Sequence, residues 1–408
     1  MILKPSLNEL NLSEHQTIFL RADLNVPIKE GKILEDYKIN AILPTIDFIL
    51  NKNCKIILAT HLGRPKLENK EFTYDPEITT NILIPWFKQK GYKIKFSKNI
   101  ESAVLDSKTS IILLENLRFF KGEQNQDIEF AKKLKYLANF YVNDAFALIH
   151  RNDTSITLLP KLFEENKKAF GLLMQKEFDS LTKIKKMPQQ PLLLIIGGNK
   201  VKDKIPLIKA FLQKPQNEAP KSIIICGAMA YTFLKAQNIS VGKSLIEEDS
   251  IEIAKNIIEE AKKQNIKIFL PIDSIGWFEN KKIIINHEDF PKELAGFDIG
   301  PKSIKIFSQE ISNAKTIFLN GTAGIYTDSN FAEGTKEILK AITKSDAYSI
   351  IGGGDGVAAA FLFKLQNKID YLSTGGGATL NFLSISEKDE LLLPGIHSIK
   401  ETLCKSKK

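Results

Sequence analysis

Arginine is almost missing from this 408-residue sequence: 53 of its 57 basic residues are lysine and only four are arginine. All four lie before residue 152, at Arg21, Arg64, Arg118 and Arg151. A chain that uses lysine at nearly every cationic position has little reason to keep arginine unless the guanidinium itself is needed. Its planar fork binds phosphate or carboxylate through two parallel hydrogen bonds, which an ammonium cannot form. We therefore expect an anion site in the amino half, with four structural ion pairs as the alternative.

Cysteine and long apolar runs are scarce as well. The three cysteines, Cys54, Cys226 and Cys404, are widely scattered and show no metal-ligand spacing, which argues against a disulfide framework and favours a reducing compartment. No apolar run approaches the ~18 residues that a membrane span needs, and the first fifteen residues show no secretory signal. These absences predict a cytoplasmic protein without a membrane partner.

The formal charge of +9 admits three interpretations: a nucleic-acid partner, an anionic substrate, or merely a lysine-rich composition. The lysines are spread along the chain rather than gathered in a tail, which weakens the first. We expect small-molecule partners and no nucleic acid.

The chain is longer than one hydrophobic core usually organises, so two domains are expected. Short apolar runs rich in β-branched residues lie at 17–22, 55–60, 92–96, 110–114, 139–142, 192–196, 222–226, 267–272, 316–319, 348–351 and 369–372. Amphipathic stretches with a helical period lie among them, at 39–50, 128–138, 250–263 and 335–342. This alternation is typical of parallel sheets covered by helices on both faces. The predicted fold is α/β: two Rossmann-like three-layer domains, 1–165 and 166–390, joined by a hinge helix at 172–186.

In the amino half, polar clusters follow four of the apolar runs. They contain all four arginines together with Asp23, Asn25 and His61. Parallel sheets bind ligands beyond the carboxyl ends of their strands, so we expect these side chains to converge on one doubly anionic small molecule. Asp23 and Asn25 would bind its hydroxyl group. Each cluster alone is a weak signal, since a single histidine at a strand end is more often structural.

The carboxyl half instead has glycine-rich turns after four of its strands, at 197–198, 321–324, 352–356 and 375–377. Glycines allow phosphates to approach the backbone, and helix N-termini offer unpaired N–H groups. Lys200 and Lys204 are four residues apart, so we expect them on one face of a helix, straddling a polyphosphate. Asp355 is a natural ligand for Mg²⁺, which takes one or two carboxylates plus phosphate oxygens.

Taken in order, these segments resemble the phosphoglycerate kinase family along nearly the whole chain. The matching segments are RADLNVP (21–27), THLGRP (60–65), ENLRFF (115–120), VNDAF with HR (142–151), LMQKE (173–177), GGNKVKDK (197–204), MAYTFLKA (229–236), GKSL (242–245), DIGP (298–301), NGTAG (320–324), GGGD (352–355), STGGGA (373–378) and LPG (393–395). The resemblance implies the glycolytic, reversible transfer of a phosphoryl group between 1,3-bisphosphoglycerate with MgADP and 3-phosphoglycerate with MgATP. It also implies an acid-binding first domain, a nucleotide-binding second domain, hinge closure, a monomer, and a tail, 391–408, that returns to the first domain.

The resemblance assigns roles residue by residue. The acid substrate would be bound by Arg21, Asp23, Asn25, Lys38, His61, Leu62, Gly63, Arg64, Arg118 and Arg151. The nucleotide would be bound by Gly198, Lys200, Lys204, Gly227, Asn320, Thr327, Gly353, Gly354, Asp355 and Gly356, with Asp355 holding Mg²⁺. The catalytic set would be Lys38, Lys200, Gly375, Gly376 and Gly377.

Five positions depart from the family pattern. Lys38 stands where the family has an arginine that stabilises the transferring group, and the loss of the fork is expected to cost roughly 1–3 kcal/mol of catalysis. Thr327 stands in place of a ribose-binding glutamate, Thr322 and Ala323 in place of Pro and Met, and Gly356 in place of a threonine. A diverged relative that binds ligands with weak or no turnover is therefore the alternative hypothesis.

Overall fold

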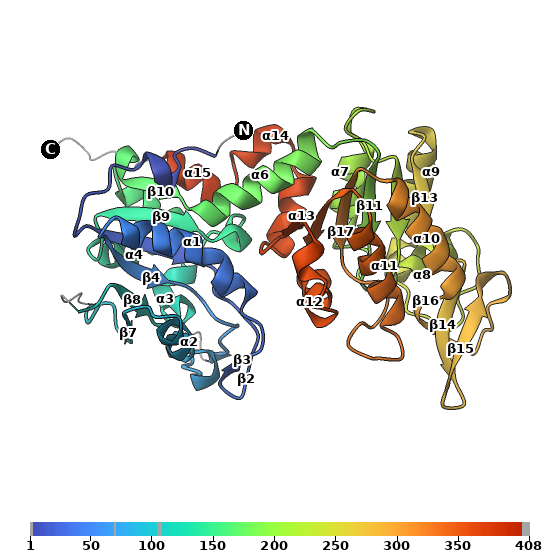
Figure 1. Cartoon of the computed structure of the whole chain (residues 1–408), viewed down its shortest axis with the longest axis horizontal. Helices are drawn as coiled ribbons and strands as arrows, with labels where there is room; N and C mark the ends of the chain where they lie inside the picture. The colour runs from blue at the N-terminus through green and yellow to red at the C-terminus, as the bar shows by residue number, and fades with distance from the viewer. Residues whose placement is uncertain (1–2, 69–70, 104–107, 402–408) are drawn as a thin grey trace. The chain divides into compact units, whose positions relative to one another are not determined.

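The computed structural model describes residues 3–68, 71–103 and 108–401. The chain forms two compact units, the first made of Met1–Asp179 and Ser386–Lys408 and the second of Ser180–Ile385. In Figure 1 the strands of the first unit run from blue to green and those of the second from green to red. The division lies inside helix α6 (Leu172–Lys186), the predicted hinge helix. The first unit extends past residue 165 because Lys168–Phe170 forms an edge strand of its sheet.

The first unit is built on a six-stranded parallel sheet, in the order β10-β9-β1-β4-β8-β7. Its strands are β1 (Thr17–Ala22), β4 (Lys55–Ala59), β7 (Ile94–Ser97), β8 (Ile111–Leu114), β9 (Phe140–Asp144) and β10 (Lys168–Phe170). Five of them coincide with predicted strands. Its other helices are α1 (Tyr37–Asn51), α2 (Ile84–Gln89), α3 (Lys121–Gln124), α4 (Ile128–Lys135), α5 (Thr154–Thr157), α14 (Glu387–Glu390) and α15 (Pro394–Lys400). Two small hairpins, β2 (Ile28–Lys29) with β3 (Lys32–Ile33) and β5 (Leu67–Glu68) with β6 (Glu71–Phe72), lie outside the sheet.

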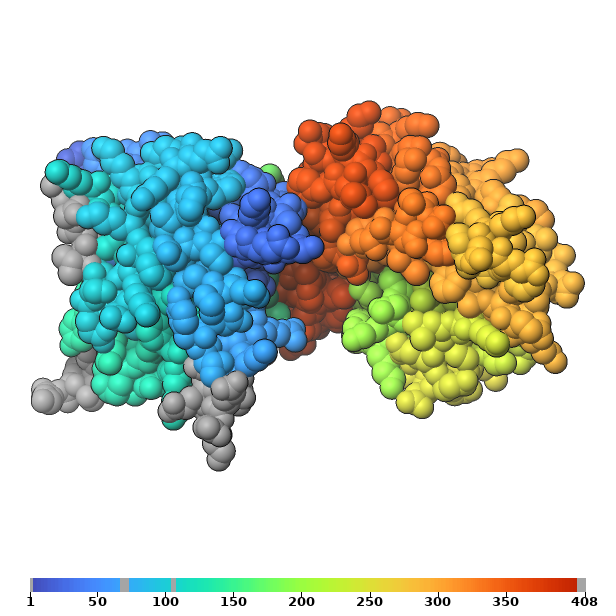
Figure 2. All heavy atoms as spheres, turned by 90° about the horizontal axis from the view of Figure 1, so that it is seen from below, coloured from blue at the N-terminus to red at the C-terminus, as the bar shows by residue number. Residues whose placement is uncertain are grey.

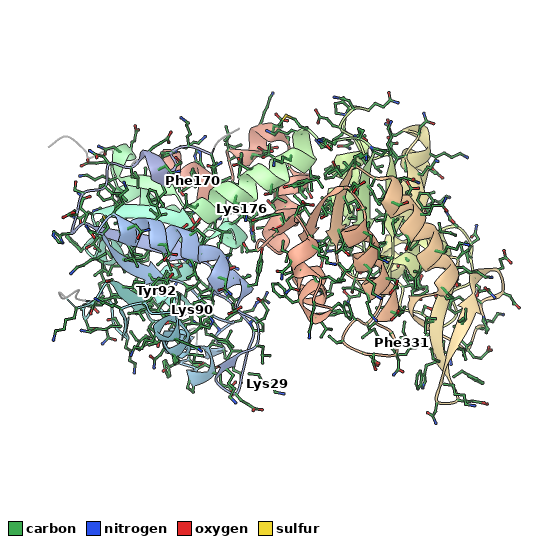
Figure 3. All side chains as sticks on the ribbon, viewed as in Figure 1. Lys29, Lys90, Tyr92, Phe170, Lys176 and Phe331 are labelled. Carbon is green, nitrogen blue, oxygen red and sulfur yellow. The ribbon has the colours of Figure 1, made fainter. Side chains whose placement is uncertain are left out.

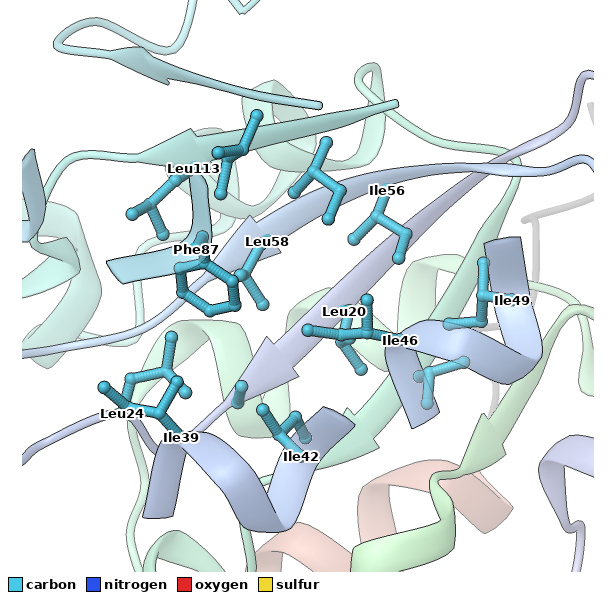
Figure 4. Close-up of a cluster of buried hydrophobic side chains, with 14 of the residues drawn as sticks. Leu20, Leu24, Ile39, Ile42, Ile46, Ile49, Ile56, Leu58, Phe87 and Leu113 are labelled. Atoms are coloured by element: carbon cyan, nitrogen blue, oxygen red, sulfur yellow. The ribbon is translucent and has the colours of Figure 1, made fainter. Parts of the chain in front are cut away.

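A buried core fixes α1 on this sheet, as Figure 4 shows. Ile39, Ile42, Ile46 and Ile49 recur at helical spacing and are at most 1% exposed, and they meet alternate residues of β1 and β4 such as Leu20. Burying each such side chain contributes about 1.5–3 kcal/mol. This packing holds the strand ends, and the loops that follow them, in fixed positions.

The second unit has the same design. Its parallel sheet runs in the order β13-β12-β11-β17-β18-β19. The strands are β11 (Leu192–Ile196), β12 (Ser222–Ile225), β13 (Lys267–Phe269), β17 (Thr316–Asn320), β18 (Tyr348–Gly352) and β19 (Tyr371–Leu372), and all six had been predicted. The helices are α7 (Ile205–Leu212), α8 (Met229–Ala236), α9 (Ile251–Lys263), α10 (Pro301–Asn313), α11 (Glu333–Lys344), α12 (Gly354–Leu362) and α13 (Gly377–Ser384).

A three-stranded antiparallel sheet in the second unit was not predicted. It consists of β14 (Asp273–Phe278), β15 (Lys281–Asn286) and β16 (Gly296–Ile299), in the order β15-β14-β16. Glu279 and Asn280 both have positive φ, which suits the two-residue turn between β14 and β15. Phe331, labelled in Figure 3, lies with its ring centroid 5.9 Å from that of Trp277 and 4.9 Å from that of Phe297. The surface of this region is yellow to orange in Figure 2.

The residues after Ser386 pack on the first unit. The Gly395 amide donates to the Ile149 carbonyl at 2.8 Å, and the Ser398 hydroxyl donates to the Ile156 carbonyl at 2.8 Å. The predicted tail, 391–408, is therefore seen as far as Glu401, while its last part, including Cys404, lies outside the described residues. Among the described helices none is long and apolar enough to cross a membrane.

Candidate active site

Four neighbouring strands of the first sheet, β9, β1, β4 and β8, end at one edge. The predicted acid-site residues follow them directly, except Lys38, which lies in the first turn of α1, and Arg21, which lies within β1. Because these strands are adjacent and parallel, loops from positions more than 100 residues apart in sequence come together. This is the edge at which open parallel sheets bind ligands.

Arg118 lies at the centre of a group of cations. It is 6% exposed, and its Nη1 donates to the Gly63 carbonyl at 2.6 Å, while its buried Nε has no hydrogen-bond partner among the described residues. Burial, together with the charges of Arg151, Arg21 and Arg64, lowers the pKa of Arg118 to about 10, although Asp153 opposes them. Arg21, Arg64 and Arg151 therefore all lie within electrostatic reach of Arg118. Such a concentration of buried positive charge is stabilised by a bound anion.

The other two surface arginines are more accessible. Arg64 is exposed. Arg151 is partly exposed, with 36% of its side chain accessible, and its Nε donates to Asp153 at 3.2 Å. Both lie near enough to Arg118 for their charges to lower its pKa.

Arg21 lies behind this group rather than on its surface. It is fully buried, its Nε donates to the Ser155 hydroxyl at 2.7 Å, and its Nη2 lies 3.6 Å from the buried Glu123 carboxylate. Burial raises the pKa of Glu123 to about 7 in spite of this arginine. Arg21 thus forms the structural ion pair of the alternative interpretation, and its charge reaches the site without direct exposure. A contact between Arg21 and the substrate stays a prediction.

His61, Asp23 and Lys38 form the other end of the site. His61 is 4% exposed. Burial lowers the pKa of its ring well below the usual value; Asp23 opposes this lowering, whereas Arg21, Arg118 and Lys38 add to it. The ring is therefore neutral at pH 7. Burial acts to raise the pKa of Asp23, but Lys38, His61 and the hydrogen bonds from Lys38 and Asn25 outweigh it and lower that pKa. The Lys38 Nζ donates to Asp23 Oδ2 at 2.6 Å.

The loop between His61 and Arg64 is held from two sides. The Gly63 amide donates to Asn25 Oδ1 at 2.8 Å, and its carbonyl accepts from Arg118. Leu62 has its side chain in the hydrophobic core, while its carbonyl accepts from Asn116 at 2.7 Å. The predicted residues Asn25, Leu62 and Gly63 therefore shape the loop that carries His61 and Arg64.

In the second unit, a pocket of about 550 Å³ opens at the carboxyl ends of β11, β12 and β17. Four of the predicted nucleotide residues line it: Gly198, Gly227, Thr327 and Asp355. Its other lining residues come mainly from three segments, 228–245, 295–299 and 322–326. A volume of this size suits a nucleoside.

Glycine is required at Gly227, where a Cβ atom would lie 2.6 Å from the amide nitrogen of Gly198 and from the Thr322 carbonyl oxygen. The predicted Gly353 and Gly354 form the N-cap and first residue of α12, and Gly376 and Gly377 those of α13, just after Gly375. Gly356 is buried against Ile351, 3.0 Å from where its Cβ would lie, so a threonine here would require that neighbour to move.

Lys200 and Lys204 do not share a helical face, so this prediction was wrong. α7 begins only at Ile205, with Pro206 in its first turn, and residues 201–204 form a turn instead. The amides of Val201 and Lys202 donate to Glu247, which replaces helical hydrogen bonding. Lys200 is exposed, and the Lys204 Nζ donates to Asn320 Oδ1. Burial lowers the pKa of Lys204, opposed by Asp203 and Asp355.

Asp355 is an exposed carboxylate in the first turn of α12, at the edge of the pocket. The described residues contain no group of three or more His, Cys, Asp or Glu side chains that could enclose a metal. A single carboxylate beside a polyphosphate is nevertheless what Mg²⁺ commonly uses, since phosphate oxygens and water complete its octahedron. The residues present fit Mg²⁺ bound together with a nucleotide.

Several lining residues had been missed. Tyr231, Phe297 and Tyr326 provide the aromatic surface of the pocket, and burial together with Asp355 raises the pKa of Tyr326. Tyr231 lies within the family segment 229–236, and Phe297 belongs to the antiparallel sheet, which the sequence pattern does not predict. Their common feature, a place in the lining of one pocket, depends on the fold.

Comparison with known proteins agrees with this geometry. The family profile "Phosphoglycerate kinase" matches residues 7–385. A protein named phosphoglycerate kinase from Finegoldia magna is 40% identical, with 98% of this chain and 99% of that protein covered. One from Koribacter versatilis is also 40% identical, with 97% of this chain and 99% of that protein covered. A solved phosphoglycerate kinase from Coxiella burnetii is 33% identical with a TM-score of 0.82, covering 97% of this chain and 98% of that one.

Two α/β units, each built on a parallel sheet, with a group of cations in one and a pocket of nucleoside size in the other, are the architecture of a two-domain phosphotransferase. The chain belongs to the phosphoglycerate kinase family. The resemblance and the fold predicted from the sequence are both confirmed.

Proposed function

We propose that this chain catalyses the reversible transfer of a phosphoryl group between 1,3-bisphosphoglycerate with MgADP and 3-phosphoglycerate with MgATP. The observation that carries the proposal is the group of cations around Arg118 in a chain of this family. A buried arginine whose pKa is lowered by three other arginines calls for a multiply charged anion. The phosphate and the carboxylate of 3-phosphoglycerate supply two such charges on one small molecule.

The acid is oriented by the two ends of the site. Its phosphate accepts hydrogen bonds from Arg64, Arg118 and Arg151, and its carboxylate lies toward His61 and Lys38. Asp23 and Asn25 lie where they can bind the hydroxyl group. Such an orientation presents the carboxylate for phosphorylation, which is the alignment that phosphoryl transfer depends on.

The nucleotide occupies the pocket of the second unit. Its phosphates lie toward Lys200, Lys204 and the N-termini of α12 and α13, where unpaired amides favour anions. Asp355 would hold Mg²⁺, which would offset the charge of the phosphate oxygens. Because the acid and nucleotide sites belong to different units, transfer requires hinge bending at α6. The protein acts as a monomer in the cytoplasm and forms no covalent enzyme intermediate.

A coupled assay of ATP-dependent phosphorylation of 3-phosphoglycerate tests the proposal. We expect turnover in the presence of Mg²⁺ and none with EDTA. Pure, folded protein that shows no turnover at millimolar substrates and Mg²⁺ would leave the diverged, inactive relative as the better hypothesis. Binding of 3-phosphoglycerate without turnover would identify that alternative positively.

A further inference from the structure

The nucleotide pocket of the second unit has two ends, which follow from the order of the strands. Asp355 follows β18, whereas Gly227 follows β12 and Pro271 follows β13, and all three residues line the pocket. In the sheet, β13 and β18 are four positions apart, which is about 19 Å at the usual strand spacing. Since the phosphates lie beside Asp355 in the proposed reaction, the base of the nucleotide lies toward β12 and β13.

Apolar surface makes up most of this base end. Leu245, Phe297 and the ring of Tyr231 line it. The Tyr231 hydroxyl is bonded outside the pocket lining: it lies 2.9 Å from Ser274 Oγ, which in turn lies 2.7 Å from Nε2 of the buried His287. Such a surface stacks on any base without distinguishing one from another, because every base has a π-face.

The backbone around the base end is also occupied. The Leu294 carbonyl accepts from the Lys243 amide at 2.7 Å, and the Gly296 amide donates to the Ser244 hydroxyl at 3.0 Å. Gly296 in turn packs so closely on the Tyr231 hydroxyl that a Cβ atom would overlap it. These contacts fix the segment GKSL (242–245), to which the resemblance assigned no role, beside the base.

This segment brings one cation to the base end. Lys243 lines the pocket and is exposed, and in the part of the chain that the structure describes its ammonium has no hydrogen-bond or ion-pair partner. An ammonium has three donors and no acceptor. It therefore binds the O6 and N7 acceptors of guanine, whereas adenine has an amino donor in place of O6.

We propose that Lys243 determines the base specificity of this enzyme: its ammonium donates to the 6-oxo group of a purine, so that guanine and hypoxanthine nucleotides are preferred to adenine nucleotides. The inference rests on the proposed function and names the class of nucleotide for it. ATP stays a substrate, since the apolar surface of the base end stacks on either purine.

The experiment compares kcat/KM for MgATP, MgGTP and MgITP in the phosphorylation of 3-phosphoglycerate, with a coupled assay that detects 1,3-bisphosphoglycerate. In the wild type we expect GTP and ITP to exceed ATP by roughly five- to tenfold, the lower range for one base contact of this kind. In K243M the three values should agree within about twofold, because only stacking remains. K235M is the matched control, since Lys235 is an exposed lysine of α8 outside the pocket lining, and it should keep the wild-type preference.

Three results would each overturn the inference. Equal kcat/KM values for the three nucleotides in the wild type would show that the base is not read. A preference for GTP that ITP does not share would show that the 2-amino group, which Lys243 cannot accept from, is recognised instead. A loss in K243M that is equal for ATP and GTP would assign the lysine to the phosphates.

Isothermal titration of MgGDP and MgADP into the full chain separates this inference from the proposed function, because it requires no turnover. Tighter binding of GDP that is lost in K243M, in a protein that phosphorylates 3-phosphoglycerate with none of the nucleotides, would contradict only the proposed function. Turnover with equal use of ATP, GTP and ITP would contradict only the role of Lys243.

Discussion

Replacing Arg118 by lysine should make acid binding depend on pH in a way that wild-type binding does not. Burial and three neighbouring arginines lower the pKa of Arg118 from 12.5 to about 10, which leaves the guanidinium charged at any physiological pH. A lysine starts from a pKa of about 10.4. The same lowering would bring its pKa to roughly 8.

The size of the effect follows from that value. With a pKa of roughly 8, about 90% of the variant would carry the charge at pH 7 and about 10% at pH 9. Relative to the wild type, the affinity of R118K for 3-phosphoglycerate should therefore fall roughly tenfold over this range. A further loss of about 1–3 kcal/mol is expected at every pH, because the ammonium lacks the fork and the contact with the Gly63 carbonyl at 2.6 Å.

Isothermal titration of 3-phosphoglycerate into each protein at pH 7, 8 and 9, at constant ionic strength, measures both terms. Taking the ratio to the wild type removes the titration of the ligand and of His61. R118M is the matched control, since it lacks the charge at every pH and should bind weakly with a flat ratio. A flat ratio for R118K as well would refute the reasoning, because it would mean that the arginines do not raise the local potential as their positions imply.

Three other predictions follow from the described contacts. T327E should lower the KM for ATP roughly tenfold and increase the preference for ATP over dATP, since a carboxylate binds a ribose diol more strongly than a hydroxyl; T327Q is the neutral control, and equal KM values for the two variants would contradict the idea. D355N should reduce kcat/KM by at least about 100-fold and weaken MgATP binding, whereas D346N, at an exposed position before β18, should not. Activity of D355N comparable to that of the wild type would show that Asp355 does not hold the metal. Burial raises the pKa of Asp144 to about 7, above its unfolded value near 3.9, so the native state binds more protons between these values and the wild type loses stability as pH rises through them. In urea unfolding at pH 5 and pH 8, the free energy of unfolding of D144N should fall by roughly 2–3 kcal/mol less than that of the wild type. Equal losses would exclude this carboxyl as the cause.

The sequence by itself determined every strand of the two six-stranded sheets except β10, and the places where ligands are expected. Strands such as 192–196 and 316–320 are runs of apolar residues, and their burial on both faces is written in that local pattern. Glycine turns and polar clusters at strand ends are local signals too. Because parallel strands end at one edge, these local signals are sufficient to predict that the four arginines come together.

Only the tertiary structure decided which charged side chains face a ligand and which face the protein. The scarcity of arginine predicts the same anion-binding role for Arg21 and Arg118. Arg21, however, is enclosed by Ser155 and Glu123, more than 100 residues away in sequence, while Arg118 keeps an unpaired Nε. The Glu247 carboxylate that accepts from the Val201 amide and the Lys38–Asp23 pair are likewise contacts between partners that no local pattern identifies. The period of a strand is set by its own residues, but the partner of a charge is set by whatever the fold places beside it.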